Sequence, residues 1–145
     1  MKKIVSITIL TAIIITLCCC FTACYKQIEG VYELQKIVID MGGAKLEITA
    51  GKDIEYNDSK SKIEKTAITV TLQNDKTFEM KGELFDDSFS QTGSWQQNGT
   101  DLILKTENES IKATISGNTI ALEYDKMKII LVNTTKTYWQ QTFGF

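Results

Sequence analysis

The chain has 145 residues, of which 43% are hydrophobic and 23% are charged, and its formal net charge is −2. It contains no histidine, and all its basic residues are lysines. This composition excludes an imidazole base, a serine–histidine relay, an imidazole metal ligand and an arginine clamp for anions. The charges are interspersed rather than clustered, which disfavours a nucleic-acid surface. We therefore expect a chain that is not an enzyme, carries no cofactor and binds no nucleic acid.

Residues 1–23 are predicted to be a lipoprotein signal peptide. Two lysines near the start precede an uncharged apolar run over residues 4–21, and Thr22, Ala23 and Cys24 follow. A basic start, an apolar run and small residues at the end are typical of an export signal. The segment before the cysteine resembles the bacterial lipobox, which implies cleavage before Cys24 and lipidation of its thiol. The alternative is an uncleaved membrane helix, since the run is close to the lower spanning limit of about 17–25 residues.

Residues 24–29 form the lipidated cysteine and a short linker in this interpretation. The linker from Tyr25 to Glu29 spans at most about 17 Å when extended. The remaining cysteines lie in the apolar run, so no disulfide is expected in the folded domain. We therefore expect a domain held against the extracytoplasmic face of the cell membrane by its lipid, and any envelope protein partner must come to that surface.

Residues 30–132 show the strongest structural pattern of the chain, which is apolar alternation with a period of two. This period is typical of half-buried strands, and the polar turns between the runs favour an antiparallel meander. In the first run, Ile37 and Ile39 compete with Val38 for the buried face. The expected inward positions are Tyr32, Leu34 and Val38; Leu46 and Ile48; Ile68, Val70 and Leu72; Phe78 and Met80; Phe89, Gly93 and Trp95; Leu102 and Leu104; Ile111, Ala113 and Ile115; Ile120, Leu122 and Tyr124; and Met127, Ile129 and Leu131.

The spacing predicts an all-β fold of about eight to nine antiparallel strands that form a barrel. Residues 133–145 are then a C-terminal tail or a last strand. Two tripeptides, Gly30-Val31-Tyr32 and Gly93-Ser94-Trp95, and the turns within residues 72–78 and 98–104 stand in the order seen in small bacterial lipocalin-like lipoproteins. The chain resembles that family over residues 30–132, with tyrosine in place of the first tryptophan. The resemblance implies a lipocalin-like barrel.

Tyr32 and Trp95 are the candidate ligand-binding residues. They could line a cavity for a small apolar ligand. Alternatively, they plug the closed end of the barrel, where Gly30 and Gly93 admit close approach of the backbone. Eight-stranded barrels are either filled by side chains or hold one small ligand, and composition leaves both possibilities open.

The segment Asp53–Glu64 has oxygen-bearing residues at positions that partly match a calcium-binding loop. Asp58 stands where that loop needs a glycine, and Lys60 and Lys62 bring repelling charge. We therefore expect a solvated loop here and no metal site.

The predicted function is that of a membrane-anchored extracytoplasmic lipoprotein that binds a small apolar ligand or a protein partner at the membrane surface. The alternative is a purely structural or interaction lipoprotein with a filled barrel and no ligand. Catalysis is ranked last, although carboxylate, lysine or tyrosine chemistry stays open. Asp86 and Asp87 are adjacent acids in a turn, where such residues are ordinary, and we expect no catalytic pair there.

Overall fold

The structure is a computed structural model that describes residues 27–56, 58–84 and 86–135. The predictions for residues 1–23, for Cys24 and for the end of the chain beyond Thr135 lie outside the described residues. Among those residues, no helix has the length and apolar character needed to cross a membrane. The strands are β1 (Gly30–Asp40), β2 (Lys45–Thr49), β3 (Asp53–Tyr56), β4 (Ser59–Lys62), β5 (Ile68–Leu72), β6 (Thr77–Leu84), β7 (Asp87–Asn98), β8 (Asp101–Lys105), β9 (Ser110–Ser116), β10 (Thr119–Tyr124) and β11 (Met127–Asn133), and a 3-10 helix, η1, spans Lys65–Ala67.

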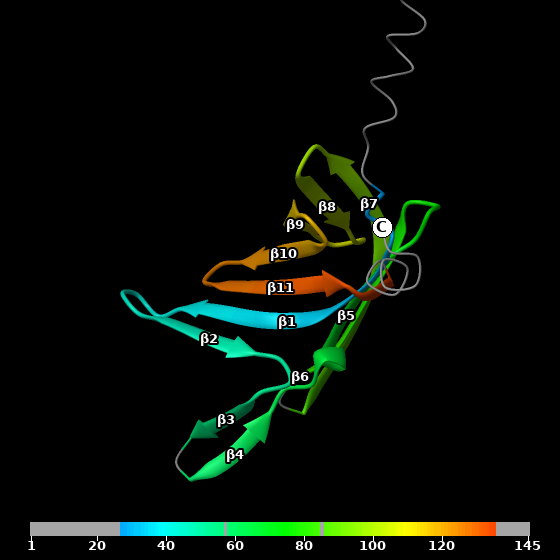
Figure 1. Cartoon of the computed structure of the whole chain (residues 1–145). Helices are drawn as coiled ribbons and strands as arrows, with labels where there is room; N and C mark the ends of the chain where they lie inside the picture. The colour runs from blue at the N-terminus through cyan, green and yellow to red at the C-terminus, as the bar shows by residue number, and fades with distance from the viewer. Residues whose placement is uncertain (1–26, 57, 85, 136–145) are drawn as a thin grey trace, which may run out of the picture.

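Eight of these strands close into an antiparallel barrel (Figure 1). The hydrogen-bonded order is β11-β10-β9-β8-β7-β6-β5-β1, and β11 also pairs with β1, which closes the ring. β1 pairs with β5 over Gly30–Glu33 and then with β2 over Lys36–Asp40. The extra strand β2 therefore replaces β5 along the second half of β1. The predicted all-β antiparallel barrel is confirmed.

A bulge in β1 corrects one predicted register. The pairing of β1 with β11 shifts between Leu34 and Lys36. Leu34 is 1% exposed and the next deeply buried residue is Ile37, at 3%, whereas Val38 is only partly buried. The prediction that Val38 shares the inner face with Leu34 is wrong, because one extra residue in a strand moves every later side chain to the other face.

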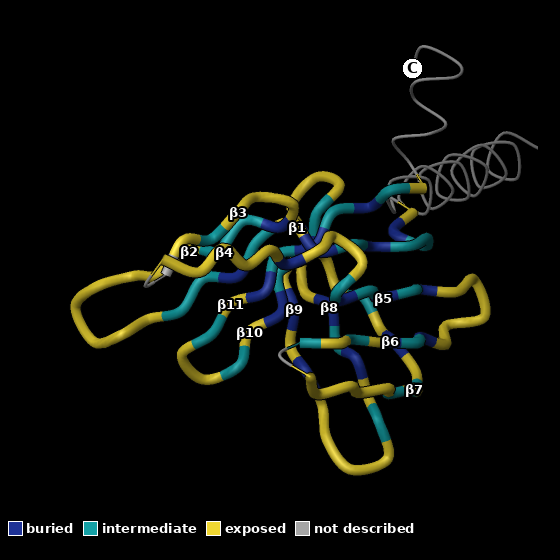
Figure 2. The backbone as a smooth tube through the Cα atoms, turned by 90° about the horizontal axis from the view of Figure 1, so that it is seen from below, coloured by how far each residue is buried: buried dark blue, intermediate teal, exposed yellow. Residues whose placement is uncertain are grey.

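The barrel interior is filled by the side chains that alternation predicted on the other strands. Figure 2 shows the buried segments along the strands and the exposed segments mainly at the hairpin ends. The inward side chains form one continuous hydrophobic cluster. The largest of those less than 2% exposed are Trp95, Tyr32, Phe78, Ile28, Leu34, Ile68, Leu72, Leu102, Leu104, Ile120, Leu122 and Leu131.

The packed domain extends slightly beyond the residues 30–132 that alternation marks. Ile28 is 1% exposed and Asn133 is 0% exposed. Asn133 is the last residue of β11, and its Nδ2 donates to the carbonyl oxygen of Glu29 at 3.3 Å. The side chain of Asn133 leaves little room at Gly30, whose φ of +135° is accessible mainly to glycine. The chain thus enters the barrel beside the end of its last strand.

The segment Asp53–Glu64 contains a hairpin rather than the expected loop. β3 and β4 pair through Asp53↔Lys62 and Glu55↔Lys60. The Lys60 ammonium lies 3.4 Å from a Glu55 carboxylate oxygen, and Lys62 lies 3.1 Å from Glu64. Strand pairing therefore places each of these acids beside a lysine instead of around a common centre.

Candidate functional site

Tyr32 lies at the closed end of the barrel, where the chain enters. It is 2% exposed, and its hydroxyl donates to the carbonyl oxygen of Ile28 at 2.6 Å. Burial raises the pKa of the Tyr32 phenol, and this effect exceeds that of the hydrogen bond with Asn133, which lowers it. The phenol is therefore a packed, hydrogen-bonded group that closes this end of the barrel.

Trp95 packs at the same end and is 1% exposed. Its Nε1–H donates to the carbonyl oxygen of Gln73 at 3.0 Å. The Lys76 ammonium lies 3.7 Å from the centroid of the indole ring and 3.6 Å from a carboxylate oxygen of Glu29. A surface hollow of about 550 Å³ is lined in part by Trp95 and Lys76, but Lys76 covers the ring. The structure therefore brings both sequence candidates together at one end, in packed positions.

A different feature opens the wall of the barrel, because β7 is longer than its neighbour β8. β7 pairs with β6 from Asp87 to Ser94, but it pairs with β8 only from Ser94 to Asn98. On the β8 side, residues 88–93 have no strand partner within the described part of the chain. We call this stretch the free edge of β7.

Close approach of the two backbones marks the point where β8 departs from β7. A Cβ atom at Gly93 would lie 1.9 Å from the carbonyl oxygen of Lys105, so only glycine fits there. β8 ends at Lys105, and the chain turns into β9 through residues 106–109. The Thr106 amide donates to the Glu109 carbonyl oxygen at 2.9 Å, and the Thr106 hydroxyl accepts from the Glu109 amide at 3.1 Å. A tight, hydrogen-bonded turn thus removes β8 from the free edge.

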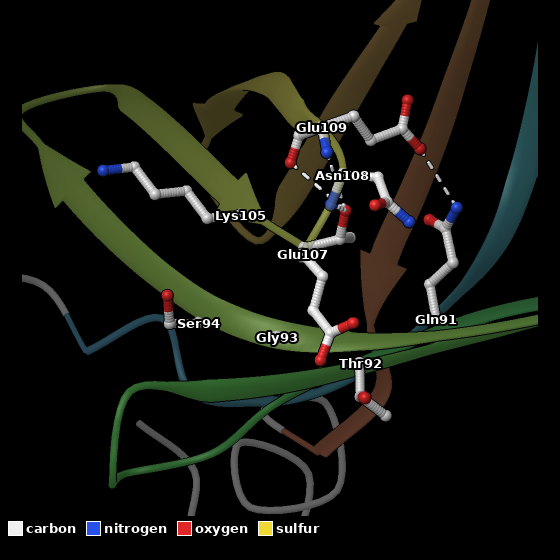
Figure 3. Close-up of a pocket in the computed structure, with 9 residues that line it drawn as sticks. Gln91, Thr92, Gly93, Ser94, Lys105, Glu107, Asn108 and Glu109 are labelled. Atoms are coloured by element: carbon white, nitrogen blue, oxygen red, sulfur yellow. Dashed lines mark hydrogen bonds between the residues drawn. The ribbon is translucent and has the colours of Figure 1, made fainter.

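The space between the free edge and this turn is a groove of about 610 Å³ (Figure 3). Its lining residues are Gln91, Thr92, Gly93, Ser94, Lys105, Thr106, Glu107, Asn108 and Glu109. Figure 3 shows Glu107 extending from the turn toward Thr92 and Gly93, while Lys105 points away from Glu107. The groove is polar and carries more acid than base. We call it the β7 groove.

Gln91 closes the inner side of the β7 groove. Its Nε2 donates to a carboxylate oxygen of Glu109 at 3.0 Å. Its Oε1 is buried and accepts no hydrogen bond from the described residues. Burial raises the pKa of the nearby Tyr124 phenol, and the charge of Glu109 raises it further. The groove therefore contains a fixed amide and carboxylate pair, with one acceptor atom still available.

The groove offers hydrogen bonds and charge rather than an evident catalytic set. It has two carboxylates and a lysine but no cysteine or histidine. In the described ranges no three histidine, cysteine, aspartate or glutamate residues gather in a way that could hold a metal ion. Asp86 lies in a turn with φ of +73°, and Asp87 begins β7 opposite Leu84. This arrangement is suited to recognition of a polar partner.

The sequence analysis did not predict the β7 groove. The available signal was the absence of charge between Asp87 and Asp101 in a chain that is 23% charged. That absence is unusual for an exposed strand, because strand edges are commonly protected by lysine, proline or bulges. The residue that ends the pairing, Gly93, was noted only as a position on the inner face.

The fold defines the class of this protein as an all-β chain built on a closed eight-stranded antiparallel barrel with one added strand. A family model that describes an Orthopoxvirus protein matches residues 1–142, and the chain belongs to that Orthopoxvirus protein family. Among solved structures, it is similar to a lipocalin-like protein from Bacteroides uniformis, with 12% sequence identity and a TM-score of 0.46 over 73% of this chain and 97% of that one. No curated protein matches the sequence.

Proposed function

We propose that the chain is a membrane-tethered binding module that recognises a protein partner through the β7 groove and performs no catalysis. The observation that carries this proposal is the contrast between a packed interior and an open wall. Trp95, Tyr32 and Phe78 are each at most 2% exposed inside the barrel, whereas the β7 groove measures about 610 Å³ and is lined by polar groups. Side chains already occupy the place of an interior apolar ligand, so recognition falls to the outer surface.

The tether in this proposal is a lipid on Cys24 at the extracytoplasmic face of the cell membrane. It is supported by the basic start, the apolar run and the small residues before Cys24. The chain would leave the anchor and enter the barrel at Ile28, which is next to the Tyr32 hydroxyl.

The β7 groove begins at the end of the barrel away from this tether. Lys76 pairs with Glu29 just before β6 begins at Thr77. β6 then runs to Leu84 at the far end, and β7 returns from Asp87. The free edge therefore starts at the end that would point away from the membrane, where a partner has access.

The test compares an interior ligand with a surface partner. Full-length protein in detergent micelles is titrated with a fluorescent fatty-acid analogue, and we expect no saturable one-to-one binding. In membranes of the native cells, a photo-crosslinking residue at Thr92 should give one discrete adduct. The same residue at Lys112, which is exposed on β9, should give none. Stoichiometric binding of the fatty-acid analogue, with adducts absent at Thr92, would show that the barrel is a ligand carrier instead.

A further inference from the structure

We infer that the partner binds as an added β-strand: an extended segment carrying lysine or arginine pairs antiparallel with the free edge of β7, beside Glu107. This inference rests on the proposed function and specifies how the β7 groove recognises its partner. Strand addition to an exposed sheet edge is a general mode of peptide recognition, in which main-chain hydrogen bonds supply affinity and flanking pockets supply specificity.

The phase of the main-chain groups along β7 shows which of them face the free edge. The Trp95 amide donates to the Lys76 carbonyl oxygen of the turn before β6, at 2.8 Å. Main-chain groups alternate in direction along an antiparallel strand, and the β6–β7 register continues without a break from Thr77↔Ser94 to Leu84↔Asp87. The amides of Gln91 and Gly93 therefore point to β6, whereas the N–H and C=O groups of Ser90 and Thr92 point to the β7 groove.

The free edge has the length and surface that an added strand needs. Residues 88–93 extend over about 20 Å, from about 3.4 Å per residue. Ser88, Ser90 and Thr92 are exposed and bring small hydroxyl side chains to the outer face. The free edge contains no lysine, proline or bulge, which are the features that normally prevent such pairing.

Other strand edges in the described sheet differ in this respect. β2 pairs only with β1 and carries Lys45 and Glu47, and β4 carries Lys60 and Lys62. Charge along an edge disfavours an added strand, because the incoming strand must either match each charge or desolvate it at a cost. The free edge of β7 is uncharged over its whole length, which marks it as the edge available to a partner.

Charge in the groove determines what kind of segment fits. The carboxylates of Glu107 and Glu109 line the groove, and Lys105 points away from Glu107. The buried Oε1 of Gln91 adds a free acceptor. A lysine or arginine of the added strand would complement these groups. A second copy of this chain would instead bring its own Glu107 and Glu109 to the same place, and like charges would oppose that dimer.

The experiment follows amide hydrogen exchange by NMR in the full-length protein in detergent micelles. The probe is an acetylated and amidated heptapeptide that alternates apolar or threonine residues with lysine, Thr-Lys-Val-Lys-Thr-Lys-Val. In the free protein, the Ser90 and Thr92 amides should exchange fast and the Gln91 amide slowly. Millimolar peptide should slow exchange at Ser90 and Thr92 at least about fivefold, as expected for a gained main-chain hydrogen bond, and should leave Gln91 unchanged.

Two matched peptides and two protein variants test the mode of pairing. N-methylation of the alternate peptide amides that face β7 should weaken binding roughly tenfold, whereas methylation of the other set should leave it unchanged. Glu107→Gln should weaken binding roughly two- to fivefold, the range of an exposed ion pair. Glu123→Gln on β10, outside the groove, is the control and should have no effect.

Each alternative gives a distinct result. Peptide binding with equal sensitivity to both methylation patterns, or no protection of Ser90 and Thr92, would overturn strand addition. In that case the crosslink at Thr92 would show whether the groove still binds a partner by another mode. A tighter complex with the matching glutamate peptide would overturn the charge assignment. Concentration-dependent dimers in light scattering, abolished by proline at Ser90, would identify a second copy as the occupant and overturn the basic-segment inference.

Discussion

Trp95→Ala is the substitution whose cost the structure defines most fully. The indole is 1% exposed, its Nε1–H donates to Gln73 at 3.0 Å, and Lys76 lies 3.7 Å from the ring centroid. Truncation of a buried tryptophan costs about 3–5 kcal/mol. The hydrogen bond contributes only about 1 kcal/mol net, and a cation–π contact with a mostly exposed lysine about 0.5–1 kcal/mol. Burial of the ring is therefore the dominant contribution.

Two control variants separate these contributions. Trp95→Phe keeps most of the buried ring but loses the Nε1–H, which leaves the Gln73 carbonyl oxygen without this donor. It should cost about 1–3 kcal/mol, the penalty of an unsatisfied buried group. Lys76→Met keeps the aliphatic stem over the ring and removes the charge, and should cost less than about 1 kcal/mol.

The measurement is equilibrium urea unfolding followed by far-UV circular dichroism, with the m-value unchanged among the variants. A typical domain has a total stability of about 5–15 kcal/mol, so Trp95→Ala should show a large drop in the transition midpoint. A loss below about 1 kcal/mol, well under the usual range for core truncation, together with altered binding of a fluorescent fatty-acid analogue, would refute the reasoning. Trp95 would then line an open cavity rather than fill the closed end.

Three further predictions concern the anchor, the seam of the barrel and alkaline pH. Mass spectrometry of membrane-extracted protein should find lipid on an N-terminal Cys24, and an intact residue 1–23 segment on the mature protein would contradict the signal-peptide interpretation. Gly93→Ala should cost at least about 2 kcal/mol through overpacking, because its Cβ would lie 1.9 Å from a main-chain oxygen of β8; Gly99→Ala, with nothing within 4 Å and φ of +62°, should cost only about 1 kcal/mol. Burial raises the pKa of Tyr32 above its ordinary 10.0, so its contribution to stability is present below pH 10 and lost as the pH rises from 10 through the folded pKa; Tyr32→Phe should show a smaller fall in melting temperature over that window than the parent chain.

Much of the fold could be predicted because most strands bury one face only. In β5, for example, Ile68, Val70 and Leu72 are buried and the two threonines between them are only partly buried. Alternation of this kind determines both the strand and its inward face. β1 was harder, because Ile37, Val38 and Ile39 are consecutive apolar residues and fit either face. Pairing with β2 and β11 selects Ile37, and such long-range partners are not visible in local sequence.

The candidate site could not be predicted in the same way. The β7 groove depends on the difference in length between β7 and β8 and on where pairing between them stops. The turn at Thr106 is formed by hydrogen bonds to Glu109, but its position relative to β7 is a property of the closed barrel. Alternation along β7 shows that Gln91 faces inward, yet it does not reveal that the β8 side of that residue is open.

Gly93 links the packed interior to the free edge. On the inner face, a Cβ atom there would lie 2.9 Å from the Phe78 ring, and along the edge it would lie 1.9 Å from the Lys105 carbonyl oxygen. The missing side chain therefore permits both the close packing of Phe78 and the close contact at which β8 ends. Beyond this residue β7 continues with β6 alone as its strand partner in the described sheet. Because β6 supplies half of the main-chain hydrogen bonds of the free edge, the strand stays extended while its other half stays available, which is the preorganised state that an added strand requires.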